Sequence, residues 1–239
     1  MLLDALFSGD FESAVISLVF SLPIILLALS LHETAHGYVA YKCGDHTAYN
    51  LGRLTLNPMK HIDPMGFVCM LLLGFGWAKP VPINTRNFNN PKRGMALSAL
   101  AGPLANAIMG LISAVLLGLT NALYFRLLLT GASEFALTCL SYTSLLFELS
   151  ALYNLIFMAF NLIPIPPFDG SRIALVFLPP KVYFGLMKYE RQIMFGLLIA
   201  LLLLSRLGYS PFSWIAYKLT DAVTESSLKF FLRIFGFDI

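Results

Sequence analysis

The stretch SLPIILLALSLHETAHGYVAYK, residues 21–42, decides the fold of this chain. It begins as an almost continuous run of hydrocarbon side chains and ends with two histidines, a glutamate and a lysine. The whole apolar run, from about residue 13 to residue 41, is long enough to cross a bilayer as a helix. Ionisable side chains are expensive to bury in such a helix, so they indicate a function rather than packing.

The composition of the whole chain predicts an integral membrane protein. Of its 239 residues, 58% are hydrophobic and only 12% are charged, which is far from the average of a soluble domain. We expect one domain, 1–239, because the length leaves no room for an appended soluble domain. The net charge of +3 is small and the basic residues lie in loops, so we expect no nucleic-acid partner. The three cysteines are widely spaced without a CxxC pair, which argues against a disulfide framework.

Four apolar runs predict spanning helices, so the expected fold is an all-α membrane bundle. They cover about 13–41, 94–119, 135–163 and 191–208. A fifth run, MGFVCMLLLGFGWA (65–78), is too short to cross and contains two glycines near its end. We expect it to enter the membrane and return, either buried against protein or lining a wet cavity. The aromatic-rich tail, about 211–237, predicts an interfacial helix.

The positively charged residues predict the orientation, because they favour the cytoplasmic side of a membrane. Most of the sixteen Lys and Arg residues lie in the connections 42–93 and 164–191. If 65–78 does not cross, both connections face the cytoplasm and the N-terminus lies outside. The first residues contain acids but no Lys or Arg, so they lack the basic region of a cleavable signal peptide. We therefore expect a multi-pass protein of the inner (plasma) membrane of the cell.

The sequence HETAH, residues 32–36, has the spacing of a zinc site on a helix. His32 and His36 are one helical turn apart and share a face, which lets two imidazoles reach one ion. Glu33 is rotated by about 100° from His32 and is placed to act on a water at that ion as a general base. His36 lies roughly 9 Å of helical rise before Lys42. The sequence therefore predicts a zinc site at membrane depth, near the cytoplasmic side.

A catalytic zinc site usually has a third protein ligand. Asp169 is the favoured residue, because it belongs to NLIPIPPFDG (161–170), where prolines stop a helix and Gly170 permits a turn. His61 and Asp63, in NPMKHIDPMG, are the rivals. The full set of candidates on the cytoplasmic side is Cys43, Asp45, His46, His61, Asp63, Asp169 and Glu190.

The combination of HETAH with NLIPIPPFDG resembles the site-2 protease family, peptidase family M50, of intramembrane zinc metalloproteases. The chain is most similar to the short bacterial members of the family without PDZ or CBS domains, and the similarity covers roughly residues 13–190. The resemblance implies that Asp169 joins His32 and His36 as the third zinc ligand. It also implies that Glu33 activates the water. The motif continues as DGSR, where many members have a second glycine or a histidine after DG, and this departure concerns the shape of the turn.

Three further motifs extend the resemblance. Asn161 is similar to an asparagine that helps to orient the substrate or the oxyanion. AGPLAN (101–106) resembles a motif linked to substrate accommodation. GFGWAKPVPIN (74–84) resembles a re-entrant hairpin whose edge strand pairs with the substrate, so the resemblance implies a β-containing hairpin in the fold. The residues concerned here are Gly102, Pro103, Asn106, Val81 and Asn84. The two asparagines, 106 and 161, have the alternative of bonding across helices.

The expected function is hydrolysis of peptide bonds within or near transmembrane segments, with one Zn²⁺ per chain. The expected partners are transmembrane proteins or peptides in the lipid bilayer, and a homo-oligomer is also considered. A metal-ion transporter or metal-binding membrane protein is the alternative, and a structural scaffold comes third. HExxH contains a general base that transport does not require.

One carboxylate stays outside this scheme. Glu148 lies near the middle of the predicted 135–163 helix, where an ionisable residue indicates a function by default. The alternative is a protonated acid that is hydrogen-bonded across the bundle. Asn154 is either its neighbour or the site of another interhelical bond.

Overall fold

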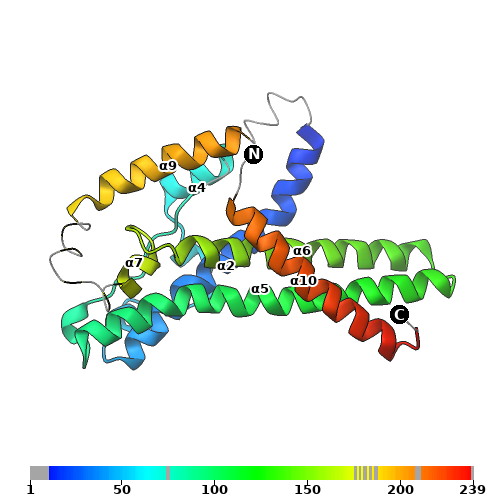
Figure 1. Cartoon of the computed structure of the whole chain (residues 1–239), viewed down its shortest axis with the longest axis horizontal. Coiled ribbons are helices and arrows are strands. Elements are labelled where there is room, and N and C mark those ends of the chain that lie inside the picture. Colours follow the sequence, from blue (N-terminus) through cyan, green and yellow to red (C-terminus); the bar gives the residue numbers. More distant parts are fainter. Residues whose placement is uncertain are drawn as a thin grey trace. The chain divides into compact units, whose positions relative to one another are not determined.

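The structure is a computed structural model, and it describes residues 11–73, 76–174, 188–207 and 211–237, together with 177, 179, 182 and 185. Helices make up most of these residues (Figure 1), and no β-strand is assigned among them. The chain divides into two compact units. The first comprises Met1–Ala105 and Phe160–Tyr209, and the second comprises Asn106–Ala159 and Ser210–Ile239.

The first unit is built on helix α2, Phe11–Lys42, which carries HETAH. Pro23 lies inside α2 without ending it. The start of helix α5, Pro91–Leu129, also belongs to this unit. The other elements of the first unit are α3 (Thr47–Asn50), η1 (Pro58–Lys60), α4 (Pro64–Leu73), η2 (Thr85–Asn87), α7 (Asp169–Ala174) and α9 (Glu190–Arg206).

Three helices are long and apolar enough to cross a membrane, as judged from the described residues. They cover Leu18–Lys42, Pro91–Leu129 and Glu134–Asn161, and they coincide with three of the four predicted spans. The fourth predicted span, 191–208, corresponds to α9, which has 17 residues and is not among the three. At about 1.5 Å of rise per residue, α9 is roughly 25 Å long, less than the hydrocarbon core of about 30 Å. Four spans are therefore not established, whereas three helices have the length and composition of membrane spans.

The predicted re-entrant hairpin is helical rather than β-containing in its described part. Residues 64–73 form α4, and β-pairing is limited to an isolated antiparallel bridge between Ile62 and Ala78. The chain does return to its starting point, since a Cβ on Gly66 would lie 3.0 Å from the Trp77 nitrogen. The β-pairing prediction was too extensive because Pro80 and Pro82 have no N–H groups with which to continue a ladder.

The second unit contains the remainder of α5, most of helix α6 (Glu134–Asn161) and helix α10 (Pro211–Ile234). Polar side chains link α5 and α6 at seven-residue intervals along α5. Asn106 donates to Asn154 (3.2 Å), the Ser113 and Ser150 hydroxyls are 2.8 Å apart, and Ser144 donates to Thr120 (2.9 Å). Such bonds hold membrane helices together where apolar packing is not selective.

Helix α10 packs on both other helices of this unit and crosses them in Figure 1. Its Ala216 is fully buried with Leu152 and Leu155 of α6. Its Thr224 hydroxyl donates to the Ala114 carbonyl of α5 at 3.3 Å. The predicted helix in the tail is confirmed, whereas its place at the membrane interface stays a prediction.

Candidate metal centre

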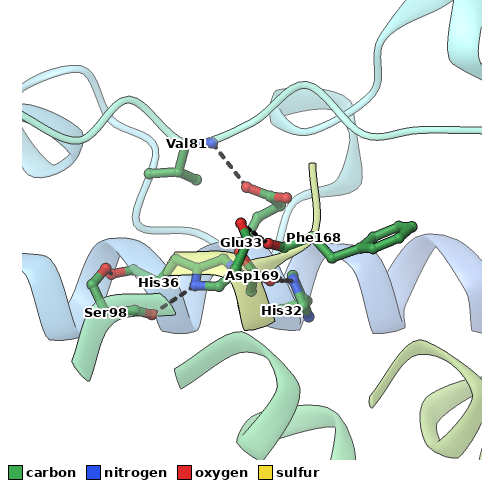
Figure 2. Close-up of polar contacts among 8 residues, drawn as sticks. His32, Glu33, His36, Val81, Ser98, Phe168 and Asp169 are labelled. Carbon is green, nitrogen blue, oxygen red and sulfur yellow. Dashed lines mark hydrogen bonds and ion pairs between the residues drawn. The ribbon is translucent and has the colours of Figure 1, made fainter. Parts of the chain in front are cut away.

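Three side chains that are far apart in the sequence converge in the first unit. His32 and His36 lie one turn apart on α2, and Asp169 is the first residue of α7. The two Nε2 atoms are 2.9 Å apart, and each is 3.1 Å from Asp169 Oδ2. Figure 2 shows the histidines and Asp169 directed toward one another. Both histidines are buried.

This donor set fits a zinc ion. In a tetrahedral site with bonds of about 2.0–2.1 Å, neighbouring ligand atoms are roughly 3.3 Å apart. The three observed separations are 2.9, 3.1 and 3.1 Å, so small movements of the side chains accommodate an ion between them. Two imidazoles and one carboxylate leave a fourth position open, which is typical of catalytic zinc. Within the described part of the chain, this is the only group of three such donors that could hold a metal.

The orientation of His36 is fixed by the backbone of α5. Nδ1 of His36 lies 2.7 Å from the Ser98 carbonyl, so Nδ1 carries the proton and donates it. The Nε2 lone pair of the neutral ring is therefore free for a metal. The Ser98 hydroxyl donates in return to the His36 carbonyl at 2.9 Å, and Ser98 is fully buried. The sequence offered no signal for this role, because a serine in an apolar helix is equally typical of packing.

Gly102 lets α5 approach the two histidines. A Cβ built on Gly102 would collide with Nε2 of His36 and would lie 2.7 Å from Cε1 of His32. Only a residue without a side chain fits this position. Pro103, the next residue, is fully buried inside α5. The structure thus places the AGPLAN motif beside HETAH, and substrate contact by Gly102 or Pro103 stays a prediction.

The end of α6 and the residues that follow it set the position of Asp169. Helix α6 ends at Asn161, and three prolines precede the start of α7 at Asp169. A Cβ on Gly170 would collide with the carbonyls of Leu162 and Ile163, so glycine permits this tight return. Burial raises the pKa of the Asp169 carboxyl, but the hydrogen bonds to His32 and His36 and their charges outweigh it, so its pKa is lowered. Ionised Asp169 is the form that binds a metal.

Glu33 is held by a backbone amide rather than by another side chain. The Val81 N–H donates to Glu33 Oε2 at 2.8 Å (Figure 2), and Val81 is itself buried. The approach of Val81 to α2 depends on Gly37, because a Cβ there would lie 3.1 Å from the Val81 side chain. The carboxylate expected to act as a base is therefore tied to the segment 78–84.

The same segment is fixed at its other end by Asp45. The Asn84 N–H donates to Asp45 Oδ2 at 2.7 Å, and the Asn87 side chain donates to Oδ1 at 2.8 Å. Asp45 is fully buried. Burial raises its pKa, but the hydrogen bonds from Thr47, Asn84 and Asn87 outweigh it, so the pKa is lowered. Asp45 was a candidate metal ligand in the sequence, and its observed contacts are to this segment instead.

The two rival ligands of the 57–66 loop lie outside the metal cluster. His61 is buried, and its Nε2–H donates to the Thr55 carbonyl at 2.7 Å. Asp63 accepts from the Gly66 N–H at 2.9 Å near the start of α4. Cys43 and His46 are also outside the cluster, and the Glu190 side chain lies outside what the structure describes.

Asn106 and Asn161, the two asparagines predicted to contact the substrate or the oxyanion, lie in different surroundings. Asn106 is fully buried and bonded to Asn154 in the second unit, which is the interhelical alternative. Asn161 is the last residue of α6. An oxyanion role for either stays a prediction.

Comparison with known proteins shows the family of the chain. The family model described as Peptidase family M50 matches residues 20–204. The chain is 38% identical over 215 residues to a Bacillus subtilis protein named Putative zinc metalloprotease YwhC, covering 88% of this chain and 90% of that protein.

Two mycobacterial relatives are more distant, and both are named Putative zinc metalloprotease Rip2. The protein of Mycolicibacterium smegmatis is 32% identical over 151 residues, and that of Mycobacterium tuberculosis is 30% identical over 154 residues. In each case the match covers 61% of this chain and 52% of the relative. No solved structure matches the chain. The family match and the similarity to YwhC, each over most of the chain, show that this protein belongs to Peptidase family M50, the site-2 protease family of zinc metalloproteases.

Proposed function

We propose that this protein hydrolyses peptide bonds within or near transmembrane segments of other membrane proteins. The observation that supports this most is the cluster of His32, His36 and Asp169, whose two histidines come from a helix that is long and apolar enough to span a membrane. A peptide bond in a transmembrane helix is protected by its own hydrogen bonds, so cleavage needs water and a catalyst at membrane depth.

The roles of the residues follow from their chemistry. His32, His36 and Asp169 hold the zinc ion, which when bound supplies a Lewis acid and lowers the pKa of water. Glu33 accepts a proton from the attacking water and returns it to the leaving amine. The Val81 N–H keeps one oxygen of Glu33 occupied, which orients the other oxygen.

Residues 81–84 cannot offer all of their backbone N–H groups to a substrate, as an ordinary edge strand would. The N–H groups of Val81 and Asn84 already donate to Glu33 and Asp45, and Pro82 has none. We therefore propose that an unwound substrate pairs with the carbonyls of this segment and with the Ile83 N–H, which has no partner among the described residues.

The location is part of the proposal. We propose that the site lies near the cytoplasmic face of the inner membrane, with the N-terminus outside and α9 as a fourth span; the basic connections 42–93 and 164–191 support this orientation. A transport path would need a series of ligand clusters, whereas one group of three His, Cys, Asp or Glu donors is found among the described residues.

The experiment that tests this function separates the metal from the base. Glu33→Gln should keep about one zinc per chain and lose cleavage of a helical substrate, whereas Asp169→Ala should lose both. Glu225→Gln is the matched control, because Glu225 is exposed and pairs only with Lys229 at 2.6 Å. Full activity in Glu33→Gln would contradict the proposed mechanism.

A further inference from the structure

A second polar feature of the molecule takes no part in the proposed proteolysis. It is a cavity of about 420 Å³ in the second unit, bounded by α5, α6 and α10. Its walls are rich in oxygen-bearing side chains, although two of the three helices, α5 and α6, are long and apolar enough to span a membrane. The polar residues lining it are Asn121, Tyr124, Ser141, Ser144, Glu148, Tyr217, Thr220, Asp221 and Thr224.

Two carboxylates face this cavity without a counter-charge. Glu148 lies near the middle of α6 and Asp221 near the middle of α10. In the described part of the chain, neither makes a hydrogen bond or an ion pair. None of the residues lining the cavity is Lys, Arg or His. A carboxylate at the centre of a spanning helix is unfavourable unless it has a partner. Both residues are exposed, so this pair is open to a positive charge from outside the chain.

Thr220 gives independent support for a ligand. Its side chain lines the cavity and only 3% of the residue is exposed. Its Oγ1 has no hydrogen-bond partner in the part of the chain that the structure describes. Buried hydroxyls almost always have a partner, and an exception needs an explanation such as a bound ion or water.

The helices around the cavity are already fixed. Gly118 of α5 meets Ser227 of α10 so closely that a Cβ would collide with the serine hydroxyl. Ser144 on α6 donates to Thr120 on α5 at 2.9 Å. The cavity is therefore preformed, and binding a ligand does not require the helices to assemble around it.

We propose that this cavity binds a hard divalent cation of the Mg²⁺ or Ca²⁺ type, with Glu148 and Asp221 as its charged ligands. Every polar atom that the cavity offers as a metal ligand is an oxygen, which favours these ions over zinc. Two carboxylates balance two positive charges. At about 30 Å³ per water, the volume leaves space for the ion and roughly ten waters, so hydroxyls and waters complete the coordination. The ion joins α6 to α10.

Binding can be measured without reference to proteolysis. The zinc-loaded, full-length protein in detergent is titrated with MgCl₂ or CaCl₂, with choline chloride at equal ionic strength as the control. We expect saturable binding by calorimetry and a rise of the unfolding midpoint by several degrees for at least one of the two cations. The cation that gives the larger rise identifies which of the two the site prefers.

Isosteric variants locate the site. Glu148→Gln and Asp221→Asn should each weaken cation binding at least tenfold, and Thr220→Val several-fold, with zinc content unchanged. Glu225→Gln, which changes an exposed carboxylate on the same helix α10, should bind like wild type. Glu33→Gln should also bind the cation normally, so a failure of the proteolytic proposal does not affect this result.

Two outcomes would overturn the proposal. One is the absence of saturable binding of either cation to the wild-type protein beyond the effect of choline chloride, which requires no variant to fold. The other is wild-type affinity in both Glu148→Gln and Asp221→Asn, which would place any bound cation elsewhere.

Discussion

The backbone N–H of Val81 donates to Oε2 of Glu33 at 2.8 Å, so the carboxylate expected to act as a base is positioned by a loop and not by the helix that carries it. The loop is itself anchored. The Lys79 N–H donates to the His61 carbonyl at 2.8 Å, and the Arg53 guanidinium donates to the Lys79 carbonyl at 2.8 Å. The orientation of Glu33 therefore depends on contacts up to 48 positions away in the sequence.

Removing the Val81 N–H should impair catalysis without removing the metal. In Val81→Pro the side chain stays apolar but the donor is lost. We expect the cleavage rate to fall by about 10- to 100-fold, as for other residues that orient an active-site group, with zinc content near wild type. Val81→Ala controls for packing, since it keeps the N–H, and it should be much closer to wild type. Equal losses in both variants would assign the effect to packing.

Adding one methyl group at Gly102 should disturb the metal cluster. The Cβ of Gly102→Ala would collide with His36 and press on His32, although alanine is the better helix former. We expect zinc affinity to fall at least tenfold, measured by competition with a chelator. Gly196→Ala, in α9, is the control because nothing lies within 4 Å of its Cβ position. If both variants bind zinc like wild type, the close approach of α5 to the histidines is wrong.

His61→Ala should separate positioning from metal binding. The Nε2–H of His61 donates to the Thr55 carbonyl, which also accepts from the Thr34 hydroxyl, both at 2.7 Å. Losing the His61 side chain therefore loosens the backbone at 61–62, which supports the 78–84 segment through the Lys79 N–H and the bridge between Ile62 and Ala78. We expect about one zinc per chain and a cleavage rate reduced by about tenfold. Loss of the zinc in His61→Ala would instead make His61 a ligand, as the sequence left open.

The site illustrates what a sequence reveals and what it does not. The spacing in HETAH and the prolines before Asp169 are local signals, because they act through one helical turn and one helix end. The contact between His36 and the Ser98 carbonyl is invisible in the sequence, since any residue supplies a carbonyl. The role of Gly102 depends on which helix lies opposite, and no local pattern encodes that.

The errors have a physical cause too. The two glycines near the end of the 65–78 run predict a return of the chain, and the family resemblance implies a β-containing hairpin, yet the apolar part of the run is a short helix, α4. Tertiary packing decides such short apolar runs more than local propensity does. The hydrogen bond of Glu148 across the bundle is not found among the described residues. Asn154 makes its alternative, an interhelical bond with Asn106, and it also bonds to the Ser150 carbonyl.

Asp45 should make stability depend on pH in the acidic range. Its pKa is lowered in the folded protein from an ordinary value of 3.8. A lowered pKa stabilises the fold fully above the unfolded value, and this contribution is lost as the pH falls through the folded value. Asp45→Asn should therefore cost about 1–3 kcal/mol near neutral pH. The gap in unfolding midpoint between the two proteins should narrow below about pH 4. A constant gap from pH 7 to pH 3 would show that the charge of Asp45 is not responsible.

The topology is the prediction on which access to the site depends. The basic residues around 86–93 predict that a reporter fused there reads as cytoplasmic, and one fused near 128–132, between α5 and α6, as external. An external signal at 86–93 would mean that 65–78 crosses the bilayer. A reporter after Ile239 then decides the role of α9: we expect an external signal, because a helix of 17 residues is at the lower limit for a span. A cytoplasmic signal there would leave three spans and place α10 on the same side as the basic connections.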